Sequence, residues 1–328
     1  MNLDERLLSN LGIVDYAYTE ESKAIHFDKY KNWLHQNLHG PLTYLEGERG
    51  DKRQDLKMFW PDFQSAIVFL FSYKDTKKKL TTDELPHQKI ASYTLGFEGL
   101  DYHYVLKEKM SLLAQEFLKE DPTIKFQISL DVHPVLERDL ALRSGLGWVG
   151  KNSMLISRKE GSYFIIASLL FNKKFGLPLK KMETDHCGQC TRCIDACPTQ
   201  AIDGATRTIR AHDCISTFTI EQMKLETIAS DKMNLGSGYI FGCDICQDVC
   251  PWNKKLLNQI NLVSTFTELQ NSILKYFCNR SASDLQSDLE GISDRQFKKK
   301  FMRTSFERSG KRGLLKNIYF YLKNTVNY

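Results

Sequence analysis

The stretch Cys187-Gly-Gln-Cys190-Thr-Arg-Cys193-Ile-Asp-Ala-Cys197-Pro198 dominates the middle of this chain. Its spacing is C-x2-C-x2-C-x3-C-P. Cys214 follows alone, and then comes Cys243-Asp-Ile-Cys246-Gln-Asp-Val-Cys250-Pro251. Eight of the nine cysteines therefore lie between residues 187 and 250, and Cys278 is the ninth. Thiolates two and three residues apart can surround one face of a [4Fe–4S] cluster, so this segment predicts iron–sulfur chemistry.

The number of cysteines predicts two such clusters, because two cubanes need eight thiolates. In the bacterial ferredoxin pattern the cysteine before proline ligates the other cluster. The first cluster is then expected to use Cys187, Cys190, Cys193 and Cys250. The second is expected to use Cys197, Cys214, Cys243 and Cys246. The second run is one cysteine shorter than a ferredoxin run, and Cys214 fills that gap.

Zinc is the alternative metal, because C-x2-C pairs also hold structural zinc ions. Both Cys-Pro endings and the three-residue spacing favour iron–sulfur clusters over zinc. Structural disulfides are a poor interpretation for a chain expected in a reducing compartment.

Composition and charge place the chain among ordinary globular proteins. The 328 residues are 42% hydrophobic and 26% charged, with a net charge of +5. The N-terminus shows no signal peptide, and the apolar runs are too short to span a bilayer. We therefore expect a cytoplasmic, monomeric protein without a membrane segment.

Periodicity predicts alternating helices and strands up to about residue 175. We expect two helices within residues 1–40, a buried strand over 65–72, a charged loop over 74–86, a helix over 102–119, and strands over 125–130 and 162–170. The cysteine segment follows, and residues beyond 253 read as helices.

The strand over 125–130 leads into Asp131-Val-His133-Pro-Val-Leu-Glu137-Arg138 and so places Asp131 at a strand end. The following run, Gly145-Leu-Gly-Trp-Val-Gly150-Lys151-Asn152, is neither a P-loop nor a dinucleotide-binding fingerprint. Its glycines predict a close approach of the backbone to another group. His103, at the start of a helix, is more simply interpreted as a structural histidine.

A basic, amphipathic pair of helices is predicted over residues 295–316. A single acid, Glu307, accompanies nine lysines and arginines there. A solvated surface is one interpretation, but the charge density favours a nucleic-acid backbone. The residues expected to contact the nucleic acid are Lys298, Lys299, Lys300, Arg303, Arg308, Lys311 and Arg312.

Three blocks together resemble the epoxyqueuosine reductases, the cobalamin-dependent iron–sulfur enzymes of queuosine biosynthesis. The blocks are residues 130–138, residues 145–152, and the cysteine runs up to Asn253 with Cys214-Ile-Ser-Thr-Phe-Thr-Ile-Glu221. A ferredoxin alone would match only the cysteines. The resemblance implies an oxidoreductase that reduces epoxyqueuosine to queuosine at the wobble position of GUN-type tRNA anticodons.

The resemblance also implies the cofactors and the fold class. The fold is an α+β multi-domain protein: a nitroreductase-like α/β cobalamin domain (1–175), a ferredoxin-like domain with two [4Fe–4S] clusters (176–260) and a HEAT-like helical tRNA-binding segment (261–328). An external low-potential donor feeds the clusters. Asp131 is the implied proton donor, which needs a desolvated carboxyl group. The implied cobalamin contacts are Arg53, Tyr93, Asp131, Lys151, Asn152, Ser153 and Ser216.

His133 is set apart from these residues. Asp131-Val-His133 begins like a motif in which a histidine ligates cobalt, but Leu136 stands where glycine is required. We therefore interpret His133 as a packing or hydrogen-bonding residue. A corrinoid reductive dehalogenase is a rival, which would normally carry a twin-arginine export signal. A plain electron carrier is a second rival, which would not need the Asp131 block.

Overall fold

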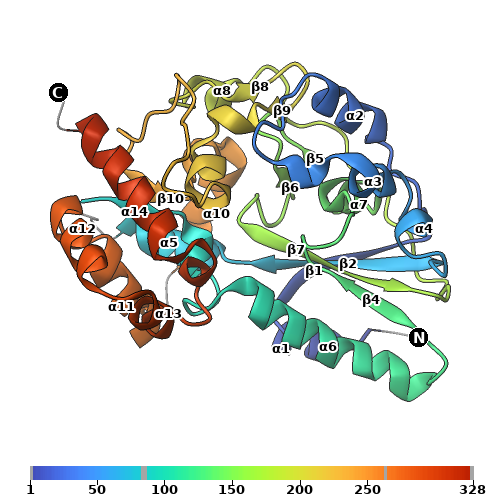
Figure 1. Ribbon diagram of the computed structural model, residues 1–328. Helices are drawn as coiled ribbons and strands as arrows, with labels where there is room; N and C mark the ends of the chain where they lie inside the picture. The colour runs from blue at the N-terminus through green and yellow to red at the C-terminus, as the bar shows by residue number, and fades with distance from the viewer. Residues whose placement is uncertain (1–2, 83–86, 262–263, 326–328) are drawn as a thin grey trace.

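The computed structural model describes residues 3–82, 87–261 and 264–325. A four-stranded sheet in the order β1-β2-β7-β4 lies at the centre of its N-terminal half (Figure 1). The strands are β1 (Ile13–Thr19), β2 (Ser65–Ser72), β4 (Phe126–Ser129) and β7 (Phe164–Phe171). All three pairings are antiparallel, so the alternation of strands and helices in the sequence does not build a parallel sheet.

Helices cover both faces of this sheet. Ile67, Phe69 and Phe71 of β2 pack on one face with α1 (Glu5–Asn10) and α6 (Tyr102–Glu120). The intervening residues of β2 pack on the other face with α4 (Leu56–Phe59) and α7 (Glu137–Arg143). This alternation follows from the two-residue period of a strand. Figure 1 shows α1 and α6 below the sheet and α7 above it.

Two sequence predictions about this half were wrong. Residues 13–19 form strand β1 and do not continue a helix. Their β-branched and aromatic side chains suit the edge position beside β2. Residues 74–82 form helix α5, not a loop. Lys77 on that helix is buried against Asp244 and Asp248, contacts that a sequence of lysines and threonines does not reveal. The rest of that predicted loop, 83–86, lies outside the described residues.

The remaining elements of residues 20–175 are short. They are α2 (Phe27–His35), η1 (Thr43–Leu45), α3 (Gly47–Asp51), η2 (Lys52–Gln54), β3 (Lys89–Ile90), η3 (Ser92–Leu95), β5 (Trp148–Val149) and β6 (Leu155–Ile156). The glycine-rich run ends in the β5–β6 hairpin. A Cβ atom at Gly147 would lie 2.2 Å from the carbonyl oxygen of Ile156, so the predicted close approach of the backbone is present.

Short elements also build the cysteine segment. They are α8 (Arg192–Asp195), β8 (Ile202–Asp203), β9 (Thr208–Ile209), η4 (Ala211–Asp213), η5 (Thr217–Glu221), β10 (Tyr239–Phe241), α9 (Ile245–Asp248) and α10 (Pro251–Gln259). Strand β10 pairs in parallel with β3, which ties this segment to the N-terminal half.

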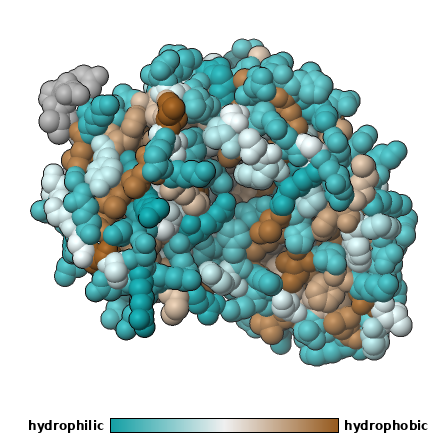
Figure 2. All heavy atoms as spheres, in the orientation of Figure 1, coloured by the Kyte–Doolittle hydropathy of each residue, from teal (hydrophilic) through white to brown (hydrophobic). Residues whose placement is uncertain are grey.

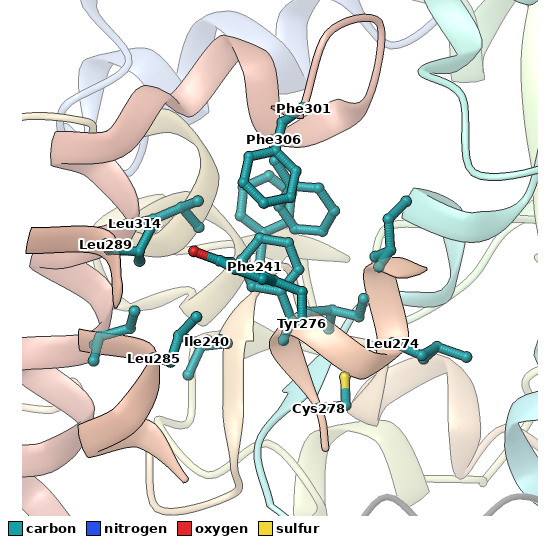
Figure 3. Packing of buried hydrophobic residues seen from close by; sticks show 14 of the residues in the cluster. Ile240, Phe241, Leu274, Tyr276, Cys278, Leu285, Leu289, Phe301, Phe306 and Leu314 are labelled. Atoms are coloured by element: carbon teal, nitrogen blue, oxygen red, sulfur yellow. The ribbon is translucent and has the colours of Figure 1, made fainter. Parts of the chain in front are cut away.

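The C-terminal helices share one hydrophobic core with both earlier segments. They are α11 (Glu268–Phe277), α12 (Ala282–Gly291), α13 (Asp294–Lys300) and α14 (Ser305–Thr325), which kinks at Gly310. Phe301 and Phe306 lie close to Phe241 of β10 and Tyr276 of α11 (Figure 3). The same cluster contains Ile90 of β3. The division into 1–175, 176–260 and 261–328 stays a prediction.

No helix within the described residues is both long enough and apolar enough to cross a membrane.

Candidate active site and cluster-binding sites

The eight clustered cysteines line two separate cavities. The larger cavity encloses about 340 Å³ and is lined by Cys197, Cys214, Cys243 and Cys246 among other residues. The smaller one encloses about 130 Å³ and is lined by Cys187, Cys190, Cys193 and Cys250. Each cavity thus takes the set of four that the sequence predicts for one cluster. Cys278 is fully buried in the C-terminal core.

Local turns produce this exchange of cysteines between the two runs. Helix α8 follows Cys190, and helix α9 follows Cys243, and the two short helices contact each other. Each run then ends in a Cys-Pro pair that directs its last cysteine to the other cavity. Cys250 caps α10, in which Pro251 takes the first-turn position that tolerates a missing N–H. The main-chain N–H of Ala201 points at the Cys197 sulfur, 3.3 Å away.

Burial makes most of these thiols hard to ionise. It raises the pKa of Cys193 to about 11, with neighbouring cysteines adding to the effect. Burial likewise raises the pKa of Cys214, Cys243, Cys246 and Cys250. Metal ligation requires thiolates, and a bound cationic centre offsets this penalty. The two sets therefore have the donor chemistry of a metal centre.

Two kinds of metal centre differ in how they use four thiolates. Tetrahedral zinc needs all four sulfurs at about 2.3 Å from one point. A cubane holds its four cysteines on four different irons. Each cavity offers the four cysteines that one cubane needs.

Asp131 lines the larger cavity together with its second-cluster cysteines. It follows β4 in a left-handed conformation with φ of 48°. The Tyr102 hydroxyl donates to one carboxylate oxygen of Asp131, and His103 Nε2 lies 2.7 Å from the other. The side chain is 45% exposed, so the protein alone does not give the expected desolvation.

His103 connects Asp131 to a second carboxylate. Its Nδ1 lies 2.7 Å from Oδ1 of Asp101, the residue that caps α6. Burial lowers the pKa of His103, but the hydrogen bonds to Asp101 and Asp131 outweigh it and raise the pKa to about 9. The imidazolium is therefore the dominant form at neutral pH. The sequence did not show that His103 contacts Asp131, because the two residues are 28 positions apart.

Glu137 fixes the main chain at Asp131 through hydrogen bonds. Its Oε1 accepts hydrogen bonds from the main-chain N–H of Asp131 at 2.7 Å and from the Ser129 hydroxyl at 2.8 Å. Burial and the neighbouring Asp131 charge raise the pKa of Glu137 to about 7. Tyr102 and Glu137 are site residues that the sequence did not identify. Tyr102 could not be singled out in the sequence, because tyrosines at helix starts are common. Glu137 was quoted only as part of the block over residues 130–138.

The wall of the larger cavity is mostly apolar between these polar ends. It includes Ile215, Ile220, Ile202, Ile209, Met154 and Phe164. The one histidine in this wall, His103, has both ring nitrogens engaged by carboxylates. His133 lies outside it and packs edge-on against Phe59 at 4.9 Å between ring centroids. The apolar side chains of this wall could pack against the ring of a corrinoid cofactor.

The predicted cobalamin contacts fall into three groups. Tyr93, Asp131 and Ser216 line the larger cavity. Lys151 and Asn152 line the smaller one, and Lys151 Nζ donates to the carbonyls of Gly188 and Cys190 at 2.7 and 3.0 Å. Arg53 and Ser153 line neither cavity: the Arg53 guanidinium donates to the Val135 carbonyl at 3.0 Å, and Ser153 Oγ donates to the Arg207 carbonyl.

The predicted tRNA-binding cations lie in different surroundings: some have partners within the protein, and others are exposed. Arg308 lines the larger cavity and pairs with Glu221 at 3.1 Å. Arg303 pairs with Glu108, Lys300 lies over the Tyr276 ring, and Lys311 Nζ donates to the Ile292 carbonyl. Lys298, Lys299 and Arg312 are exposed, and their side chains bond to none of the residues that the structure describes. Figure 2 shows hydrophilic side chains over the α13 region.

Comparison with known proteins agrees with this site. The family described as epoxyqueuosine reductase QueG matches residues 53–132, and the 4Fe-4S double cluster binding domain matches residues 186–253. An epoxyqueuosine reductase from Cyclobacterium marinum is 34% identical over 96% of this chain and 93% of its own length.

Solved structures agree as well. An epoxyqueuosine reductase with an epoxyqueuosine-modified tRNA-Tyr stem loop is 26% identical, with a TM-score of 0.72 over 98% of this chain and 82% of that chain. A Bacillus subtilis epoxyqueuosine reductase, with its aspartate catalytic loop swung out of the active site, is 25% identical, with a TM-score of 0.71 over 98% and 81% of the two chains. The two sets of four cysteines and the Asp131 loop agree with these relatives. The chain therefore belongs to the epoxyqueuosine reductase family of iron–sulfur oxidoreductases.

Proposed function

We propose that this protein reduces epoxyqueuosine to queuosine at the wobble position of tRNAs with GUN-type anticodons, with cobalamin in the larger cavity and two [4Fe–4S] clusters. The observation that carries the proposal is the composition of the larger cavity. Asp131 and four cysteines line the same enclosed space. A source of electrons and a source of protons thus flank one binding site.

The reaction needs both sources. Conversion of an epoxide to an alkene consumes two electrons and two protons and releases water. Bound cobalamin would supply a strongly reducing cobalt centre next to the substrate, and the clusters would receive electrons one at a time from an external low-potential donor. Tyr93 and Ser216 would hold the corrin, with the isoleucines of the wall excluding water.

Asp131 would deliver a proton to the epoxide oxygen. A positioned acid of this kind contributes about 10²–10⁴-fold to a rate. His103, hydrogen bonded to Asp131 and protonated at neutral pH, would return a proton to Asp131 after transfer. Tyr102 and Glu137 fix the carboxylate and the main chain of Asp131. The related Bacillus subtilis enzyme was solved with its aspartate catalytic loop swung out of the active site, which supports this assignment.

The tRNA would approach the mouth of the larger cavity. Arg308 lines that cavity at the start of α14, and exposed Lys298, Lys299 and Arg312 lie on α13 and α14. Cations in this position can neutralise the phosphates of an anticodon stem. The related enzyme solved with a modified tRNA stem loop supports a tRNA substrate.

The nucleosides of tRNA from cells that lack this protein test the proposal. We expect epoxyqueuosine to accumulate and queuosine to disappear, as measured by mass spectrometry. Wild-type protein should restore queuosine, and Asp131→Asn should not. Unchanged queuosine in the deleted cells would contradict the proposed substrate.

A further inference from the structure

The last helix carries a buried polar pair that the proposed chemistry does not use. Lys316 and Asn317 on α14 are 4% and 0% exposed. Burial lowers the pKa of Lys316 to about 7. A lysine or an asparagine in such a position is costly unless its hydrogen bonds are made. Both side chains donate to main-chain carbonyls outside their own helix, whereas Asn317 Oδ1 has no hydrogen-bond partner among the described residues.

Lys316 holds the π-helical turn η5, which begins three residues after Cys214. Its Nζ donates to the carbonyl of Phe218 and, at 2.6 Å, to the carbonyl of Gln222. The same ammonium lies 3.7 Å from the centroid of the Phe218 ring. A turn of i→i+5 type leaves carbonyls that a regular helix would satisfy differently, and such turns occur often at functional sites. Lys316 supplies the missing donors.

Asn317 joins η5 to β10. Its Nδ2 donates to the carbonyl of Thr219 and to the carbonyl of Ile240, both at 2.9 Å. Thr219 continues the link, because its Oγ1 donates to the Ile215 carbonyl at 2.7 Å and accepts the N–H of Gly242 at 2.9 Å. Ile215 follows Cys214 directly, and Gly242 precedes Cys243 directly. Asn317 therefore connects the two segments that carry these cysteines.

Helix α14 also contacts the last residue of η5. Arg308, before the kink at Gly310, pairs with Glu221, the last residue of η5. Ser216, Ile220 and Glu221 line the larger cavity. One face of α14 thus determines where this wall of the cavity lies.

We propose that Lys316 and Asn317 are positioning residues for the second cluster, fixing Cys214 and Cys243 through η5 and β10. The inference rests on the proposed two-cluster function. It assigns the C-terminal helix a role in metal retention that is separate from tRNA binding. Neither Lys316 nor Asn317 is among the residues that line the smaller cavity, where the first cluster is proposed.

Chelator-driven cluster loss tests the inference on the reconstituted full-length protein. The variants are Lys316→Met and Asn317→Leu, and the control is Arg312→Met, an exposed residue of the same helix. Release is followed anaerobically by absorbance, and EPR of the reduced protein distinguishes the two clusters. Each variant removes the donor from two buried carbonyls. We expect the second cluster to leave at least about 10-fold faster, because tenfold corresponds to the free energy of about one buried hydrogen bond.

The first cluster reports folding within the same sample. We expect its rate of loss to match that of the wild type in both variants, with all rates unchanged in Arg312→Met. Unchanged loss of the second cluster in both variants would overturn the inference, and so would equal acceleration of both clusters. Wild-type protein that binds only about four irons would instead refute the two-cluster function on which the inference rests.

Discussion

Asp131 is the residue at which the proton chemistry is expected. Its carboxylate is held by Tyr102 and His103, and its N–H by Glu137. We predict that Asp131→Asn lowers kcat by about 10²–10⁴-fold, because the amide cannot supply the acidic proton. The affinity for tRNA should stay within about 3-fold of wild type, since Asn keeps the same shape and most hydrogen bonds. Single-turnover assays and filter binding measure the two quantities.

His103 gives a pH signature to the same site. Its folded-state pKa of about 9 exceeds the ordinary value of 6.5. The stabilisation is therefore fully present below about pH 6.5, where both states are charged, and disappears as pH rises through 9. We predict that His103→Gln lowers the free energy of unfolding by about 2 kcal/mol at pH 6 and by almost nothing at pH 10.

Urea titrations of the two proteins over this pH range measure the difference. A difference that is independent of pH would show that His103 acts through packing alone.

Among the elements, those that are long and regular were predicted from sequence. The strand over 65–72 and the helix starting at Tyr102 are present with those bounds or nearly so. The apolar run of β2, and the N-cap and periodic apolar residues of α6, can be recognised directly in the sequence. Strand β1 and helix α5 were missed because tertiary contacts decide them: β1 is fixed by pairing with β2, and α5 by the burial of Lys77.

The turn at Gly161 provides an element-scale test. Gly161 has φ of +65°, and a Cβ there would lie 2.2 Å from Oδ1 of Asn253. Asn253 bonds to Ser162 and to the carbonyl of Gln247 in α9. Gly176 has φ of +62° with open space around it. We predict that Gly176→Ala costs about 1–2 kcal/mol from backbone strain alone, and that Gly161→Ala costs about 2 kcal/mol more.

Thermal unfolding followed by circular dichroism compares these two variants. Equal losses of stability in both would contradict the predicted clash between a Cβ at position 161 and Oδ1 of Asn253.

The exposed end of α13 provides a second test at this scale. Lys298 and Lys299 are exposed cations of that helix, and no side-chain partner is seen for them among the described residues. We predict that reversing both to Glu weakens tRNA binding and reduces the slope of log K against log salt by about 2, because two phosphate contacts are lost. Lys57→Glu with Lys125→Glu is the control. These exposed lysines lie on α4 and just before β4, at the other end of the molecule from α13 in Figure 1, and Lys125 pairs with Asp62. Equal weakening in the control would indicate only a general charge effect.

At the scale of the whole molecule, the two cavities receive the cysteine sets that spacing predicts. We predict that Cys214→Ala binds about four irons per chain and Cys278→Ala about eight, since of these two residues only Cys214 lines a cavity. Iron analysis after anaerobic reconstitution measures both. Eight irons in Cys214→Ala would remove it from the ligand set.

Sequence predicted the cysteine partition and Asp131, because both depend on local spacing and on blocks of motif. It did not predict that Tyr102 and His103 meet Asp131, since helix α6 and strand β4 approach only in the folded chain. It also placed Arg53 and Ser153 at the cofactor, whereas they line neither cavity. A charged side chain in a sequence does not show whether it faces a ligand or a neighbouring carbonyl.

The central claim is that cobalamin and the clusters together drive epoxide reduction above Asp131. Conversion in vitro tests it most directly, with reconstituted protein, tRNA carrying epoxyqueuosine and a low-potential reductant. Mass spectrometry follows the loss of one oxygen from the nucleoside. The account predicts conversion to queuosine only when cobalamin is supplied to cobalamin-free protein. Conversion at the same rate without cobalamin, or none with it present and both clusters loaded, would contradict the account.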